Sequence, residues 1–344
     1  MQEKVCFIIP AYNAEKYIEA SLESVLSQSH RELEVIVVND GSKDATAHMV
    51  GRISARDGRV RLLTVENGGP AMARNRGLDA MSADTEYVMF LDADDLLLPG
   101  AVEYALGAAR KGAELVMMGF SIENPDGSRR DYFEKEQWIG PEQLGEALPR
   151  LYMANMLNQV WAKLFRADLI RDNSLRFPDY RWGEDRLFIF DCLEKAKCAV
   201  VLPERHYLYV MHPGESLITR FYDKKAEVCR LADNRVRQLC ESFGTKDDAP
   251  CRYMFVKSIF SCLTNLYSPS CTLSHAEKRA YMGSILSDGQ FRSRSRGSFG
   301  GISVKVMCAV MRTGLIELNL LMFRAVAFVG KSAPRLFMAL KHKK

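Results

Sequence analysis

The sequence lacks any segment suited to crossing a membrane. It contains no run of about 18 uncharged apolar residues, the length that a spanning helix requires. The first apolar run, residues 5–10, is shorter than the hydrophobic core of a secretory signal peptide. We therefore expect no transmembrane helix and no signal peptide, and we expect the chain to act in the cytoplasm.

The cysteines lack the spacing of metal or redox motifs. There are nine of them at scattered positions, and no two form a C-x-x-C pair. Zinc sites and thiol redox centres commonly show such a pair, and disulfide frameworks use an even number. The pattern argues against both a zinc site and a disulfide framework, so we expect reduced thiols.

Other signatures are missing as well. No internal repeat, nucleic-acid-binding module, Ser-His-Asp arrangement or catalytic cysteine motif is visible in the 344 residues. We therefore expect no nucleic-acid partner. The chain does have a globular composition, with 47% hydrophobic and 26% charged residues, which suffices for one large domain or two modest ones.

Charge is unevenly distributed along the chain. From residue 221 onward there are 21 Lys and Arg against 9 Asp and Glu, a balance of +12, whereas residues 1–220 carry a balance of −8. The segment from residue 289 has eleven basic residues and one acid, Glu317. Such asymmetry suggests a polyanionic surface near the C-terminal part.

Strand and helix patterns alternate over the first 120 residues. The expected strands are residues 5–9, 33–38, 60–65, 87–91 and 114–120, and the expected helices include 18–26, 70–81 and 99–111. Asp44 is a candidate N-cap for a further helix. This alternation predicts an α/β fold, with a mostly parallel sheet flanked by helices.

The pattern changes after residue 122. Residues 124–127 predict a hairpin turn, 143–157 a helix, 202–209 a strand, and 223–287 helices with a break at 244–250. Residues 290–301 read as a basic, Ser- and Gly-rich linker. We therefore expect a catalytic domain over residues 1–220, a helical C-terminal region over 221–288 and a basic amphipathic helical tail over 289–344.

Three carboxylates, Asp92, Asp94 and Asp95, fall within four residues at the end of an expected strand. Like charges this close repel, and a divalent cation with oxygen ligands removes that cost. The cluster is a candidate Mg²⁺ or Mn²⁺ site facing a diphosphate, although acids at strand ends also serve as solvated turns or helix caps.

Polar residues also follow the other expected strands. Asn13, Asp40, Asn67 and Asp92 each lie just after one. Ligands of parallel α/β sheets bind at the carboxyl ends of the strands. We therefore expect these four side chains to converge on one crevice.

Four segments carry a family resemblance. They are residues 9–13 (Ile-Pro-Ala-Tyr-Asn), 37–44 (Val-Val-Asn-Asp-Gly-Ser-Lys-Asp), 67–77 and 91–95 (Leu-Asp-Ala-Asp-Asp). Together, over roughly the first 220 residues, they resemble the family 2 glycosyltransferases, inverting enzymes of the GT-A fold that include builders of bacterial surface polysaccharides. The resemblance implies transfer of a sugar from a UDP-sugar donor to a hydroxyl of a glycan or lipid-linked acceptor.

The same resemblance implies a donor site. Backbone near Pro10 and Tyr12 and the carboxylate of Asp40 would read the uracil, Arg74 would lie on the nucleotide side, and Asp92 near the ribose. The implied nucleotide-binding set is Pro10, Tyr12, Asn13, Asp40, Asn67, Arg74, Asp92 and Ala93. Asp94 and His212 are the implied ligands of Mn²⁺ or Mg²⁺, and residues 207–216 resemble the family's later strand and loop, which folds over the diphosphate.

Residues 182–185 (Trp-Gly-Glu-Asp) supply the expected acceptor side. Inversion needs one base to take the acceptor hydroxyl proton, a role worth about 10²–10⁴-fold in rate. The resemblance places this role on Asp185, with Glu184 orienting the acceptor or the base. Both acids also fit a helix N-terminus, where the dipole stabilises negative charge.

The tail leaves several partners open. On a helix, Lys305 and Arg312 share a face, as do Arg324 and Lys331, which is the pattern of helices lying on a membrane surface. Arg292, Arg294, Arg296 and residues 341–344 add positive charge toward anionic lipid. A peripheral position on the inner face of the cytoplasmic membrane, a subdomain packed on the catalytic domain, a homo-oligomer contact and an acidic polymer acceptor all remain open.

Two other functions remain as alternatives. A sugar-nucleotide nucleotidyltransferase would need an N-terminal Gly-rich triphosphate loop, which residues 11–15 do not provide. A catalytically retired nucleotide-sugar-binding scaffold would not need Asp94 and Asp185 together.

Overall fold

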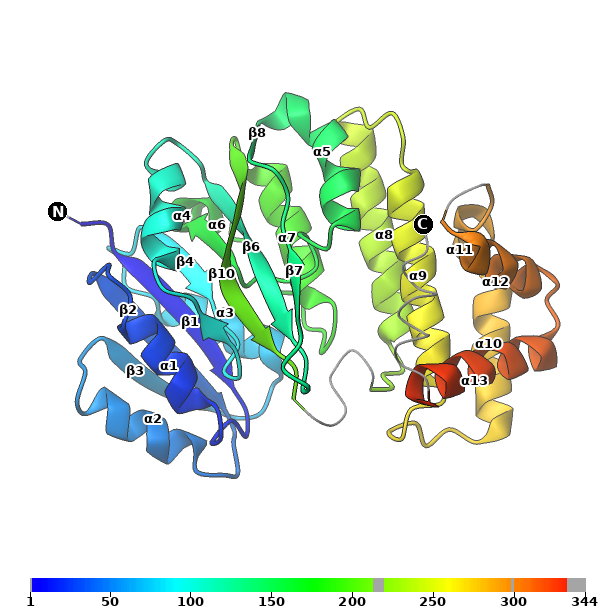
Figure 1. The fold of residues 1–344 in the computed structure, drawn as a ribbon, viewed down its shortest axis with the longest axis horizontal. Coiled ribbons are helices and arrows are strands. Elements are labelled where there is room, and N and C mark those ends of the chain that lie inside the picture. The colour runs from blue at the N-terminus through cyan, green and yellow to red at the C-terminus, as the bar shows by residue number, and fades with distance from the viewer. Residues whose placement is uncertain (1, 213–219, 298–299, 333–344) are drawn as a thin grey trace. The chain divides into compact units, whose positions relative to one another are not determined.

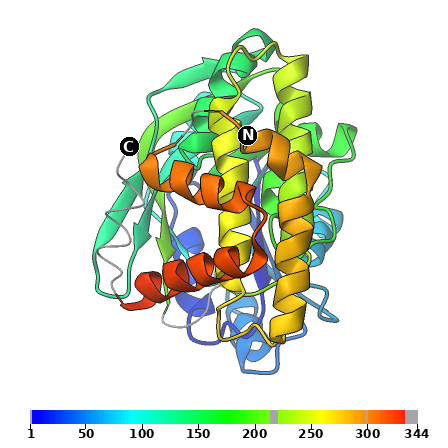
Figure 2. The same ribbon diagram turned by 90° about the vertical axis from the view of Figure 1, so that its right-hand side faces the viewer.

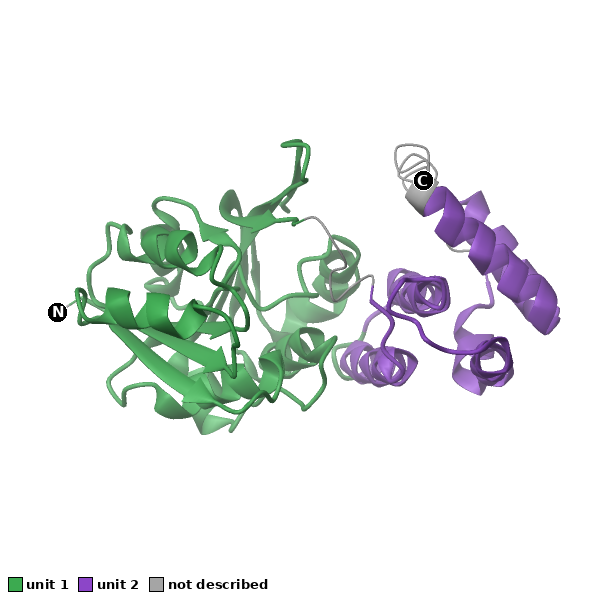
Figure 3. Ribbon diagram, turned by 90° about the horizontal axis from the view of Figure 1, so that it is seen from below, with its two compact units in different colours: residues 1–213, 242–244 green, residues 214–241, 245–344 purple. Residues whose placement is uncertain are grey.

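The computed structural model describes residues 2–212, 220–297 and 300–332, with the backbone alone at 331 and 332. The chain forms two compact units, shown in green and purple in Figure 3. One comprises Met1–Pro213 with Ser242–Gly244, and the other Gly214–Glu241 with Thr245–Lys344. The predicted regions 221–288 and 289–344 both fall mainly in the second unit.

One sheet organises the first unit (Figure 1). Its strand order is β3-β2-β1-β4-β9-β6-β10-β5, with β7 paired to β6 and β8 to β10. The strands are β1 Val5–Ala11, β2 Leu33–Asp40, β3 Val60–Val65, β4 Tyr87–Phe90, β5 Leu96–Leu97, β6 Leu115–Glu123, β7 Arg129–Tyr132, β8 Gln137–Ile139, β9 Lys163–Arg166 and β10 Ala199–Val210. Strands β1–β4, β6 and β10 all point the same way, which confirms the mostly parallel sheet.

Helices flank this sheet. They are α1 Ile18–Leu26, α2 Thr46–Ser54, α3 Pro70–Ala80, α4 Ala101–Ala109, α5 Pro141–Met153, α6 Ala167–Asp172 and α7 Glu184–Lys195. Helix α3 packs on β1 and β2, and α4 packs on β6 and β9. The central strands β1 and β2 are buried almost along their whole length, as expected where helices cover the sheet.

Two connections in the first unit bear on the predictions. The turn at 124–127 joins β6 to β7 as an antiparallel hairpin, closed by a 2.8 Å bond from the Asn124 amide to the Ser128 carbonyl, so the predicted hairpin is confirmed. Strand β9 inserts antiparallel between β4 and β6, in a stretch for which the sequence predicted no strand. It brings Lys163 into the core of the sheet.

Gly77 lets α3 approach the sheet closely. A Cβ at this position would lie 2.3 Å from Cγ2 of Ile8, which is fully buried in β1. We expect Gly77→Ala to destabilise the first unit by about 1–3 kcal/mol, as overpacked cores do. Denaturant unfolding measures this.

The control is Gly107→Ala in α4, where an added Cβ meets nothing within 4 Å. There the higher helix propensity of alanine should leave stability unchanged or raise it by up to about 1 kcal/mol. Equal effects at the two positions would contradict the close-approach argument.

Helices form the second unit. They are α8 Lys225–Ser242, α9 Ala249–Asn265, α10 His275–Ser287, α11 Gly289–Arg294, α12 Ile302–Arg312 and α13 Ile316–Ser332. The predicted linker over 290–301 is wrong in its first part, because α11 occupies it. Asp288 caps that helix by accepting a 2.7 Å bond from the Phe291 amide, Phe291 is buried, and Arg294 pairs with Asp233.

Two further observations concern the membrane and the cysteines. Within the described residues, no helix is both long and apolar enough to span a bilayer. All nine cysteines are described, and none takes part in a disulfide.

Candidate active site

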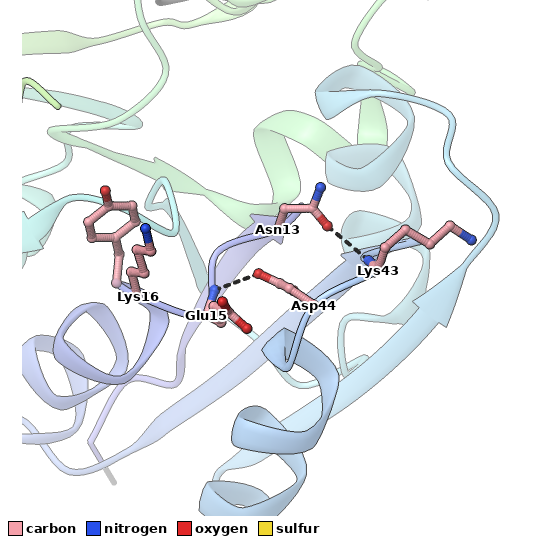
Figure 4. Close-up of a pocket in the computed structure, with 6 residues that line it drawn as sticks. Asn13, Glu15, Lys16, Lys43 and Asp44 are labelled. Carbon is pink, nitrogen blue, oxygen red and sulfur yellow. Dashed lines mark hydrogen bonds between the residues drawn. The ribbon is translucent and has the colours of Figure 1, made fainter. Parts of the chain in front are cut away.

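Loops at the carboxyl ends of β1 and β2 enclose an open pocket of about 460 Å³, lined by Asn13, Glu15, Lys16, Tyr17, Lys43 and Asp44 (Figure 4). Asn13 adopts a left-handed backbone, with φ at 50°, and its side-chain oxygen accepts a 2.8 Å bond from the Lys43 amide. The Glu15 amide donates to Asp44 at 3.1 Å. These bonds hold the two loops together at the edge where the sequence predicted a crevice.

The remaining predicted residues of β1 differ in exposure. Pro10 is half-buried within the strand, while Tyr12 just beyond its end is 53% exposed. Tyr12 is not among the residues that line the pocket, although it precedes Asn13 in the chain.

Asp40, at the end of β2, organises the neighbouring loop. Its carboxylate is buried and accepts bonds from the amides of Gly68 and Gly69, at 2.7 and 2.8 Å. The Asn67 side chain donates to the Asp40 carbonyl at 2.9 Å. Gly69 has φ at 88° and precedes Pro70, the first residue of α3. Asp40 and Asn67 therefore lie together and fix the start of α3, and neither lines the pocket beside Asn13.

The three carboxylates after β4 have different surroundings. Asp95 is fully buried, accepting a 2.7 Å bond from the Tyr207 hydroxyl and a 2.9 Å bond from the Val210 amide. Burial, with the charges of Asp92 and Asp94, raises the pKa of Asp95 well above its ordinary value. This residue ties the acidic loop to β10, and a sequence without coordinates does not distinguish it from its two neighbours.

Asp94 points away from that interior contact. Its Oδ2 lies 4.0 Å from Nε2 of His212, whose ring stacks on Tyr17 with centroids 3.9 Å apart. Crowding by the surrounding chain and the charge of Asp92 raise the pKa of Asp94 to about 6, although 49% of the side chain is open to solvent. Ala93 between the two acids is buried.

Asp94 and His212 are the predicted residues that could hold a divalent cation. Asp94 and His212 offer one carboxylate and one imidazole, and no group of three or more His, Cys, Asp and Glu side chains in the described part of the chain is arranged to hold a metal. Magnesium is commonly held by one or two carboxylates together with substrate phosphates, so a partial protein shell suits a metal shared with a diphosphate. Of the predicted strand and loop over residues 207–216, residues 213–216 lie outside the described residues.

Arg74 lies at the centre of a buried ion-pair cluster. Its guanidinium donates to Asp92 at 2.9 Å, to Glu184 at 2.9 Å and to Asp185 at 2.7 Å. The side chain is only 4% exposed, and its guanidinium carbon lies 5.5 Å from the centre of the Phe177 ring. Arg74 was predicted on the nucleotide side, and the structure places it between the end of β4 and the start of α7.

Glu184 and Asp185 occupy the first turn of α7, which begins after Gly183 with φ at 81°. Burial and the charges of Glu184 and Asp92 raise the pKa of Asp185 to about 8, against the opposing charge of Arg74. A carboxylate poised near neutrality is suited to accept a proton in catalysis. The two predicted acceptor-side acids therefore lie together and, through Arg74, adjoin the predicted donor-side Asp92.

Sequence reasoning missed the residues that support this cluster. The Asn75 side chain clasps the backbone of Phe177, donating to its carbonyl at 2.8 Å and accepting from its amide at 2.9 Å. The Phe177 ring in turn stacks on Phe188 of α7, with centroids 4.0 Å apart. Asn75 adjoins Arg74 within residues 67–77, one of the segments that carry the family resemblance. No local sequence pattern indicates a role for Phe177, about a hundred residues further on.

Buried Lys163 is a second residue that the sequence analysis did not predict near this cluster. Its Nζ donates to the Gln159 carbonyl at 2.7 Å, and burial lowers its pKa to about 7, opposed by the charge of Asp185. The only sequence signal for it is a charged residue inside an apolar stretch.

The first half of the chain matches a known protein family. Residues 6–169 match the model of Glycosyl transferase family 2. EpsJ of Bacillus subtilis, an uncharacterized glycosyltransferase, is 30% identical over 216 residues, which cover 61% of this chain and 62% of EpsJ. The matching part thus spans less than two thirds of that relative. An uncharacterized glycosyltransferase of Haemophilus influenzae is 30% identical over 199 residues, covering 57% of this chain and 74% of the relative.

Among solved structures, residues 1–349 of Staphylococcus aureus TarS, in complex with UDP-GlcNAc, superpose with a TM-score of 0.65. The identity is 21%, and the match covers 95% of this chain and 91% of that one. The likeness confirms the predicted GT-A fold. The family match and the relatives of similar sequence show that this chain belongs to Glycosyl transferase family 2.

Proposed function

We propose that the chain transfers a sugar from a UDP-sugar to a hydroxyl of a glycan or lipid-linked acceptor, with inversion at the anomeric carbon. The observation that carries the proposal is the cluster in which Arg74 joins donor-side Asp92 to acceptor-side Asp185. The UDP-GlcNAc complex of TarS, a protein of the same fold, supports a UDP-sugar as the donor.

The donor binds at the strand ends. The nucleoside lies in the pocket beside Asn13, and the diphosphate extends toward Asp94 and His212. A bound Mn²⁺ or Mg²⁺ would neutralise charge on the departing diphosphate. Asp40 keeps the Gly68–Gly69 backbone in place beneath this site.

The acceptor is activated from α7. Asp185 takes the proton of the acceptor hydroxyl while the hydroxyl oxygen attacks the anomeric carbon and the bond to UDP breaks. Since a single displacement inverts the configuration, no covalent sugar–enzyme intermediate forms. Arg74 and Glu184 hold the Asp185 carboxylate in position.

The donor site is testable without knowing the sugar or the acceptor. In calorimetric titrations with Mn²⁺ present, we expect Asp94→Asn to weaken UDP binding at least about tenfold, the smallest loss typical of disturbing a metal site. Asp79→Asn is the matched control, because Asp79 belongs to the same unit and its side chain is 51% exposed, against 49% for Asp94.

The other nucleotides decide between functions. Metal-dependent binding of UDP in preference to GDP, CDP and dTDP, lost in Asp94→Asn, supports the transferase site. Binding of UTP with release of pyrophosphate from a sugar phosphate would instead show a nucleotidyltransferase. Absence of binding by every nucleotide would overturn the proposed donor site.

A further inference from the structure

Helices α12 and α13 form an outer layer of the second unit (Figure 2). Helix α13 packs on α9 and α10, and α12 lies beside it. Each helix buries one face against the unit: Cys308 and Met311 are buried on α12, as are Leu320 and Phe323 on α13. The opposite faces are uncovered in this structure.

The uncovered face of α13 is apolar. Leu318, Leu321, Ala325 and Phe328 are spaced at three and four residues, so they share one side of the helix. That side lies opposite buried Leu320 and Phe323, and Leu321 and Phe328 are 65% and 69% exposed. A single exposed leucine is ordinary, but a continuous apolar face along a helix marks an interaction surface.

Helix α12 repeats the arrangement. Ile302, Val306 and Ala309 share a face at spacings of four and three residues, and all three are exposed, Ile302 by 81%. Lys305 and Arg312 lie exposed along the flank of this face. Arg324 holds the corresponding flank position on α13.

The charge around these faces is positive. Glu317 is the single acid between residue 289 and the C-terminus, and it is paired with Arg279 and with His275 at 3.5 Å. Lys305, Arg312 and Arg324 are therefore not balanced by an acid on their own helices. Long basic side chains beside an apolar helix face suit an anionic bilayer, because their stems lie along the acyl region and their charges reach the headgroups.

We propose that the apolar faces of α12 and α13, flanked by Lys305, Arg312 and Arg324, seat the second unit on an anionic lipid surface. A second copy of this chain is a poorer occupant, because pairing the same faces would bring basic flanks together. The inference goes beyond the sugar transfer and does not rest on it, since lipid binding needs neither donor nor acceptor.

The test is co-sedimentation of the full chain with vesicles of phosphatidylcholine, alone or with 30% phosphatidylglycerol. We expect binding to the anionic vesicles to be about tenfold tighter or more, from the summed attraction of three basic residues, and to weaken as salt is raised. The double variant Leu321→Glu/Phe328→Glu should lose the binding, and Lys305→Glu/Arg312→Glu should lose the preference for anionic lipid.

Leu231→Glu is the control, because Leu231 is an exposed leucine of the same unit on α8, 37% accessible. It should bind vesicles as the parent chain does, and circular dichroism checks that every variant is folded. Equal binding of both vesicle types, or of Leu321→Glu/Phe328→Glu and the parent, would overturn the proposal. So would a dimer, seen by light scattering, that the apolar substitutions dissociate.

Discussion

Asp185→Asn is expected to lower the transfer rate by about 10²–10⁴-fold, the contribution typical of a positioned general base. The amide is nearly the size of the carboxylate, so Arg74 and α7 keep their places, but it cannot accept the acceptor proton. Since Asp185 lies at the start of α7 and not among the strand-end loops, UDP binding should be nearly unchanged. Single-turnover sugar transfer and UDP calorimetry separate the two effects.

Asp168→Asn is the matched control, because Asp168 is also a first-turn aspartate, on α6 of the same unit, and is 61% exposed. It should retain full activity. A comparable loss in both variants would point to a general electrostatic effect, and full activity of Asp185→Asn would remove Asp185 from the mechanism.

The same residue sets the expected pH dependence. Burial and neighbouring acids raise the pKa of Asp185, so the carboxyl is protonated at lower pH and unable to act as a base. The rate should therefore rise with pH, with a midpoint near 8, instead of being constant above pH 5 as for an exposed aspartate. The residual transfer rate of Asp185→Asn should not increase with pH in this range.

Much of the sheet was predictable from the sequence because its signals are local. Runs rich in apolar residues marked β1, β2, β3, β4 and β6, and a parallel α/β sheet gathers the ends of such strands at one edge. Asn13, Asp40, Asn67 and Asp92 could be placed at that edge without coordinates. A local sequence pattern does not show which strands pair with each other. Strand β9 is an example, because its place between β4 and β6 depends on two strands distant in the sequence.

Within the site, the roles of adjacent acids could not be read from spacing. Asp94 and Asp95 are neighbours, but one is half exposed beside His212 and the other is buried against Tyr207. The difference arises from β10, more than a hundred residues later. Arg74 is a similar case, because two of its partners lie on α7, 110 and 111 residues further along the chain.

Loss of Arg74 should be the most damaging single change in this cluster. Its one guanidinium serves three carboxylates, and Asp185 and Glu184 are 17% and 7% exposed. Removing one partner of a buried ion pair typically costs about 3–5 kcal/mol, because the remaining charge is left without compensation. We therefore expect Arg74→Gln to destabilise the first unit by that amount and to abolish transfer, as measured by denaturant unfolding and by the transfer assay.

Arg74→Lys separates positioning from stability. Lysine keeps the positive charge but is a point donor that cannot span three carboxylates in the fork geometry of arginine, so the fold should be largely rescued and the rate should not. The Arg74 charge opposes the rise in the Asp185 pKa. Since lysine reaches fewer of the carboxylates, it should oppose that rise less, and the pH profile of transfer should move to more alkaline values. Arg76→Gln, an exposed arginine of the same helix, should alter stability by no more than about 0.5 kcal/mol. A profile unmoved in Arg74→Lys would show that Arg74 supports the fold without positioning the base.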